Sequence, residues 1–310
     1  MIWLLLSFLS ATLLGLYDTC KKRALKGNSI FVLLFVNTLL CSCIFIPFII
    51  LSYTTDLLDS TIFHVARGGW EVHRLIILKS LIVLSSWIFG YAGMKNLPLS
   101  ITGPINATRP VIVLIGAIFV FGERLNLCQW IGVMLAIISF YMLSRSGKRE
   151  GIDFKHNKWI FFVVLQSIFG AISGLYDRYL MAPVSEGGAG LDRMIVQSWY
   201  NIYQCLFMAI LLLIIFRRSL VHQFRFRQGW KYTTSVVCVS VFLSAADFAY
   251  FYALTYPDAM ISIVSMIRRG SVLVSFACAA LLFHEKNLRS KALDLMLVLL
   301  SMFFLYLGSR

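Results

Sequence analysis

Long apolar segments dominate this sequence and limit what the chain can fold into. A helix needs about 20 residues to cross the ~30 Å hydrocarbon core of a bilayer, and ten runs of about this length follow one another along the chain. The runs occupy residues 2–24, 29–53, 74–96, 99–121, 127–143, 158–181, 192–216, 231–254, 259–283 and 290–308. We therefore predict an all-α polytopic membrane protein with ten transmembrane helices.

The composition agrees with this prediction and excludes an ordinary soluble domain. Hydrophobic residues make up 59% of the chain and charged residues only 14%, whereas soluble domains are typically about half apolar and about a quarter charged. The net charge of +14 comes from basic residues scattered between the apolar runs, where membrane orientation and anionic headgroups account for them. We expect contact with a lipid bilayer, in a bacterial-type cytoplasmic (inner) membrane, and no nucleic-acid partner.

The two halves of the chain resemble each other. Gly-Leu-Tyr-Asp at residues 15–18 recurs at 174–177, an offset of 159 residues (177 − 18 = 159). The offset also relates Tyr91 to Tyr250 and Pro98 to Pro257, while Glu123 and Glu285 need a small insertion in the second copy. We interpret this as two five-helix repeats, residues 1–143 and 158–310, joined by a linker at 144–157. Five crossings reverse the chain direction, so the second repeat is expected to be inverted.

These features resemble a known transporter family. Ten spans in two inverted sets of five, with the fourth and ninth spans closed by Gly122-Glu123 and His284-Glu285, are similar to the drug/metabolite transporter superfamily in its EamA-like form. The resemblance covers nearly the whole chain. It implies that the first, third, fourth, sixth, eighth and ninth spans line a central cavity.

Three arginines inside apolar runs are the best candidates for a binding site. An ionisable side chain at mid-membrane costs ~2.5–3.5 kcal/mol on insertion scales, so it needs a partner or a water-filled cavity. Arg109 lies in the fourth run, and Arg268 and Arg269 lie in the ninth, which is its equivalent under the repeat. Guanidinium groups bind carboxylate or phosphate through paired hydrogen bonds. We predict that all three bind an anionic substrate. Arg268-Arg269 also resembles the basic pair on the ninth helix of the superfamily's phosphate-sugar branch.

Buried carboxylates form a second group of candidates, for ion coupling or for charge pairing. Asp18 and Asp177 repeat in the two halves, and Asp247 lies in the eighth run. Lys22, four residues after Asp18, is a candidate partner on the same helical face, and Arg178 is another for Asp177. A titrating carboxylate would couple transport to protons, whereas a paired one would be structural.

Three tyrosines complete the predicted substrate site, although most aromatic residues in such a chain pack or face lipid. Tyr17 and Tyr176 adjoin the repeated aspartates, and Tyr91 lies in the third run.

Enzymatic motifs are not found in the sequence. The five histidines fall in loops or at the ends of runs, and the seven cysteines form no CxxC pair. No nucleotide-binding motif is present. We therefore expect no enzyme, no metal and no cofactor. The preferred function is a secondary, gradient- or exchange-driven transporter of a small anionic metabolite, working by alternating access. The alternatives are a lipid-linked headgroup flippase or accessory membrane subunit in envelope glycan synthesis, and an amino-acid or drug exporter.

Two properties are left open by the sequence. The chain could function alone or as a homodimer. Basic residues in the loops favour both termini outside the cell by the positive-inside rule, whereas the family resemblance implies cytoplasmic termini.

Overall fold

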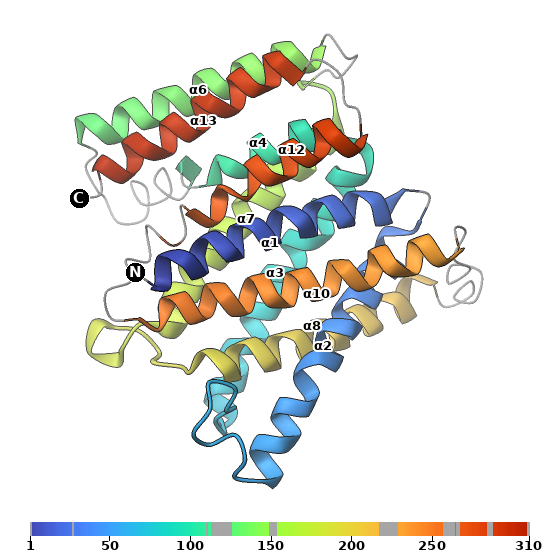
Figure 1. The fold of residues 1–310 in the computed structure, drawn as a ribbon, viewed down its shortest axis with the longest axis vertical. Coiled ribbons are helices and arrows are strands. Elements are labelled where there is room, and N and C mark those ends of the chain that lie inside the picture. Colours follow the sequence, from blue (N-terminus) through green and yellow to red (C-terminus); the bar gives the residue numbers. More distant parts are fainter. Residues whose placement is uncertain are drawn as a thin grey trace.

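The structure is a computed structural model. It describes residues 2–26, 28–109, 111–112, 126–148, 154–216, 229–256, 264, 267–283 and 288–308. Within this part the chain forms helices, turns and loops but no strand. The helices are α1 (Ile2–Leu25), α2 (Ile30–Thr54), α3 (Trp70–Asn96), α4 (Leu99–Ala107), α6 (Leu127–Lys148), α7 (Lys158–Met181), η1 (Val184–Glu186), α8 (Arg193–Phe216), α10 (Gly229–Leu254), α12 (Ser271–Phe283) and α13 (Leu288–Gly308), as labelled in Figure 1.

Among the described residues, seven helices are long and apolar enough to cross a membrane. They lie in α1, α2, α3, α7, α8, α10 and α13, and Leu127–Ser139 of α6 is a shorter apolar helix. The protein is therefore a multi-pass helical membrane protein. The predicted spans at 99–121 and 259–283 lie partly outside the described residues. Gly122-Glu123, His284-Glu285, Pro257 and the centre of the 144–157 linker lie entirely outside them.

Helices from the two halves of the sequence interleave instead of forming two separate bundles. α1 packs against α10 and α12, while α3 packs against α7 and α8. The pair of α6 and α13 lies at one end of the molecule and the pair of α2 and α8 lies toward the other (Figure 1). This arrangement surrounds the middle of the molecule with helices of both halves.

The outward and inward faces of the helices differ in the way a bilayer requires. Large apolar side chains such as Leu5, Phe8, Met134 and Ile214 are exposed, as expected for lipid-facing positions. Small residues allow close helix contact inside: a Cβ on Gly15 would come within 2.5 Å of Val274 Cβ and 2.8 Å of the Ser271 carbonyl oxygen. A glycine is thus needed where α1 meets α12.

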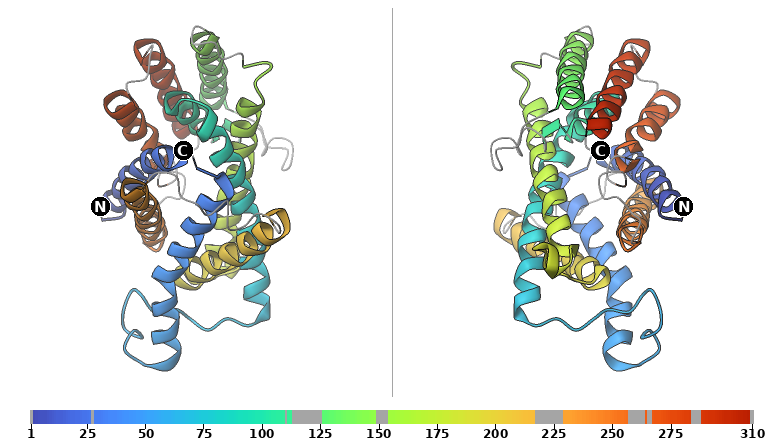
Figure 2. Two further views of the ribbon diagram at one scale, coloured as in Figure 1. Left: turned by 90° about the vertical axis from the view of Figure 1, so that its right-hand side faces the viewer. Right: turned by 90° about the vertical axis from the view of Figure 1, so that its left-hand side faces the viewer.

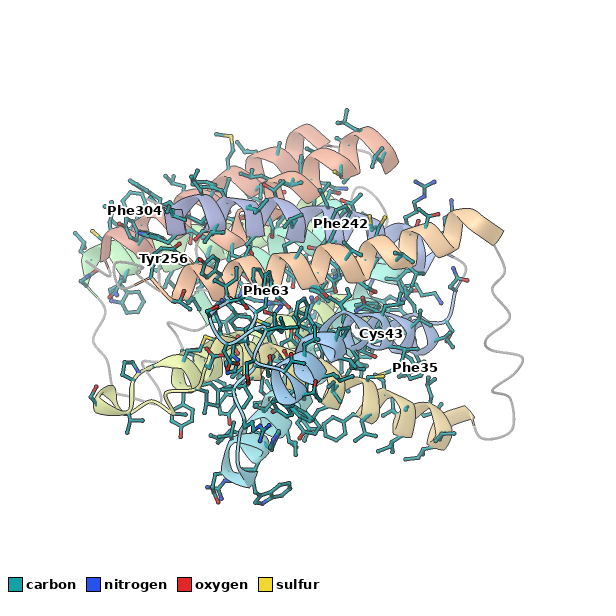
Figure 3. The ribbon with its side chains drawn as sticks, turned by 60° about the horizontal axis from the view of Figure 1, so that its bottom comes forward. Phe35, Cys43, Phe63, Phe242, Tyr256 and Phe304 are labelled. Carbon is teal, nitrogen blue, oxygen red and sulfur yellow. The ribbon has the colours of Figure 1, made fainter. Side chains whose placement is uncertain are left out.

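The loop between α2 and α3 is folded against the helices. It lies at the end of the molecule opposite α6 and α13 (Figure 2). Phe63 of this loop stacks between Phe48 of α2 and Phe248 of α10, with ring centroids 5.2 and 5.4 Å apart (Figure 3). Arg193 Nη2 donates a hydrogen bond to the Ile62 carbonyl oxygen at 2.6 Å. Aromatic stacking and this hydrogen bond hold the loop in place.

Candidate functional site

A cavity of about 170 Å³ lies between the two halves of the sequence. Its walls come from α1, α3, α4 with Arg109 just beyond it, α7, α10, and α12 with the segment that leads into it, together with one residue from α8. Apart from the α8 contribution, these are the segments that the family resemblance implies as cavity walls. Eight charged residues line the cavity: Asp18, Lys21, Lys79, Arg109, Asp177, Asp247, Arg268 and Arg269.

Three ion pairs use six of these eight charges. Lys21 Nζ bonds Asp18 Oδ1 at 2.6 Å within α1. Lys79 of α3 pairs with Asp177 of α7, and Arg268 pairs with Asp247 of α10. The latter two pairs join different helices and are almost fully buried. Each carboxylate predicted for coupling or pairing therefore has a basic partner in this structure.

Asp247 has a second donor in addition to Arg268. The Tyr200 hydroxyl of α8 donates a hydrogen bond to Asp247 Oδ2 at 2.7 Å. The Arg268 guanidinium also lies 4.1 Å from the centroid of the Tyr250 ring, a cation–π contact. Arg268 is therefore held by neighbouring side chains of its own protein.

Arg109 and Arg269 differ from Arg268 because neither makes an ion pair with a described residue. Both line the cavity, and the Arg109 Nε atom is buried without a hydrogen-bond partner among the described residues. At the 159-residue offset seen in the sequence, Asp247 corresponds to Ile88 (247 − 159 = 88), which has no carboxylate. Two guanidinium groups are thus available to a ligand.

The Arg109 guanidinium lies directly against the backbone of α7 at Gly170. A Cβ on Gly170 would stand 2.8 Å from Arg109 Nε and closer still to its Cζ and Nη1 atoms. By contrast, a Cβ on Gly174, one turn further along the same helix and also at the cavity, would have no described atom within 4 Å. The absence of a side chain at 170 is what makes room for Arg109.

Uncharged polar and aromatic groups complete the cavity wall. Gln166 and Asn106 present side-chain amides, and Trp87 and Tyr17 present rings. Asn106 Oδ1 also accepts a hydrogen bond from the Ser167 hydroxyl at 3.1 Å, which fixes its orientation. In the described part of the chain, no group of three or more His, Cys, Asp or Glu side chains is placed to hold a metal ion.

Lys22, predicted as a pairing residue, lies elsewhere than expected. Lys22 does not pair with Asp18; its ammonium donates to the carbonyl oxygens of Met94, at 2.6 Å, and Leu97. The free carbonyls at the end of α3 attract a cation, and Lys21 takes the place beside Asp18. This corrects the predicted Asp18–Lys22 pair.

Of the three predicted tyrosines, one lines the cavity and two do not. Tyr17 lines the cavity, whereas Tyr91 is buried behind it, with the two hydroxyl oxygens 3.4 Å apart. Tyr176 lies outside the cavity wall, where its hydroxyl donates to the Leu75 carbonyl oxygen at 3.2 Å and its ring stacks on Tyr179. Successive helix residues point about 100° apart, which lets Tyr176 contact Leu75 of α3 while Asp177 faces the cavity.

Sequence reasoning missed Lys21, Lys79 and Tyr200. Lys79 had a usable signal, because it lies inside the predicted span at 74–96 where any charge needs a partner. Lys21, inside the predicted span at 2–24, had the same signal, whereas Tyr200 had none, since a lone tyrosine is common in helices.

Comparison with known proteins supports the family and the fold. Residues 1–145 match the EamA-like transporter family, while no curated protein matches the chain. A solved crystal structure superposes with a TM-score of 0.65 at 13% sequence identity, covering 99% of this chain and 97% of that chain. At this identity the likeness shows the fold alone. In residues 1–145 this chain is similar to the EamA-like transporter family, in agreement with the family predicted from the sequence.

Proposed function

We propose that the protein is a secondary transporter that moves a small anionic metabolite across the membrane by alternating access. The observation that carries this proposal is the pair of cavity guanidiniums, Arg109 and Arg269, without a carboxylate partner among the described residues. Removing charges from water is costly unless they are paired. A bound anion would pair them, whereas a cation would be repelled.

The packing of the helices supports the transport mechanism. If the two halves are repeats, α1, α2, α3, α4 and α6 correspond, in this order, to α7, α8, α10, α12 and α13. The counterpart of the α1–α10 contact is then α7–α3, that of α1–α12 is α7–α4, and that of α2–α10 is α8–α3. All of these contacts occur. Such reciprocal packing is what inverted five-helix repeats would produce, and repeats of this kind rock about a central site. The flippase and exporter alternatives would use the same packing, so the choice of a small anionic substrate rests on the two cavity arginines.

Replacing Arg109 or Arg269 by glutamine is expected to lower ligand affinity by at least about tenfold. A hydrogen bond to a charged group contributes roughly 1.5–3 kcal/mol, and 1.4 kcal/mol corresponds to tenfold. Ligands are first found by the rise in melting temperature of the purified protein with phosphorylated sugars, organic acids, amino acids or nucleotides. The best ligand is then used for uptake into proteoliposomes.

The matched control is Arg74→Gln, which removes an exposed arginine that pairs with Glu71 three residues earlier. This variant should bind and transport like the wild type. Unchanged uptake by both cavity variants would refute the proposal, and the melting temperature without ligand shows whether each variant is folded.

A further inference from the structure

We infer that the cavity binds one doubly charged anion, held between Arg109 and Arg269. This inference rests on the proposed function and narrows the class of substrate. It concerns the number of negative charges, which phosphate monoesters and dicarboxylates share.

The charges that line the cavity do not balance. Five basic and three acidic residues line it, and three ion pairs neutralise six of them. Two positive charges, on Arg109 and Arg269, are left among the described lining residues. Since uncompensated charge is expensive in a region with little water, the ligand that completes this site best carries two negative charges.

Arg109 and Arg269 line the same cavity of about 170 Å³. Like charges in one small cavity repel each other. A single dianion between them removes this repulsion and pairs both groups at once. A monoanion of the same shape pairs one group and leaves the other charge uncompensated, so it binds more weakly.

The cavity also has groups that suit the remainder of the ligand. Beyond its charged residues the cavity offers uncharged amides, Gln166 and Asn106, and the ring of Trp87. These groups suit a neutral polar portion of a substrate such as hydroxyls. All other cavity charges are already paired within the protein, which leaves the two arginines to determine the charge of the ligand.

The test compares ligands that differ by one charge and little else. Succinate is compared with its monomethyl ester, and glycerol phosphate with its methyl diester, at pH 7.5, where a phosphate monoester is mainly a dianion because its second pKa is about 6. Dissociation constants are measured calorimetrically on the purified full-length protein. In at least one pair the dianion is expected to bind at least about tenfold more tightly than its monoanion, one charge-assisted contact being the difference.

Variants connect the preference to the two arginines. Arg109→Gln and Arg269→Gln should each bring the ratio of the two constants close to one, while Arg74→Gln should keep the ratio of the wild type. A preference restricted to the succinate pair or to the phosphate pair identifies the chemistry of the anion.

Failure of the dianion inference and failure of the proposed function would give different binding results. Equal or tighter binding of the monoanions in both pairs would overturn the dianion inference and leave an anion transporter. Binding of no member of either pair would overturn the dianion inference too, and if cations then stabilised the protein instead, the proposed function would fail with it.

Discussion

Gly170→Ala is expected to lower the affinity for the anion by about tenfold or more, although residue 170 carries no charge. The new methyl group would occupy the space of the Arg109 guanidinium, with its Cβ only 2.8 Å from Nε. The guanidinium must then move by roughly an ångström, and displacements of this size can cost up to ~100-fold at a functional site. Binding constants for the best dianion, measured with the melting temperature of the ligand-free protein, test this expectation.

Gly174→Ala is the matched control for this prediction. It makes the same change on the same cavity-facing side of α7, where a Cβ meets no described atom within 4 Å. Its affinity should stay near that of the wild type. In the Arg109→Gln background, Gly170→Ala should cost little more, because the group it displaces is gone. Equal losses for both glycines would show that the effect comes from α7 itself and not from the position of Arg109.

Lys79→Met is expected to destabilise the protein by about 3–5 kcal/mol, the usual effect of removing one partner of a buried ion pair. Lys79 is 2% exposed and pairs with Asp177 across the α3–α7 contact. Its removal leaves a buried carboxylate without a basic partner. The double variant Lys79→Met/Asp177→Asn removes both charges and should recover much of the loss. Unfolding midpoints in detergent measure both effects.

The exposed Arg74–Glu71 pair again supplies the control, since breaking a surface pair costs only ~0–1 kcal/mol. If Lys79→Met proved as stable as the wild type, Asp177 would have to be neutral without its partner. That result would contradict the ion-pair account and favour the proposal that Asp177 exchanges protons during transport.

The helices were more predictable than the site. Hydropathy alone places the span at 158–181, which is α7, and places α1 and α2 to within a residue. It starts α3 four residues late, at 74 instead of Trp70, because Glu71 and His73 lower the hydropathy of the first turn of this helix. Glu71 nevertheless belongs to the helix, where it forms a salt bridge with Arg74.

Pairing within the cavity was harder to predict, for a physical reason. The repeat and the cost of burying charge are visible in the sequence, and they identify Arg109, Arg268, Arg269 and the aspartates as residues that share a region. Which arginine remains without a carboxylate depends on contacts between helices that lie far apart in the chain. Arg268 meets Asp247 of α10, and Lys22 meets the end of α3 instead of Asp18; neither outcome follows from spacing.

An experimental structure of the protein, determined with a saturating concentration of its best dianion, tests the central claim most directly. The account predicts one anion in the cavity between α4, α7 and α12, within hydrogen-bonding distance of both Arg109 and Arg269, with the Lys79–Asp177 and Arg268–Asp247 pairs intact. An anion bound away from both arginines, or a cavity in which Arg109 and Arg269 are paired with carboxylates of the protein, would contradict it.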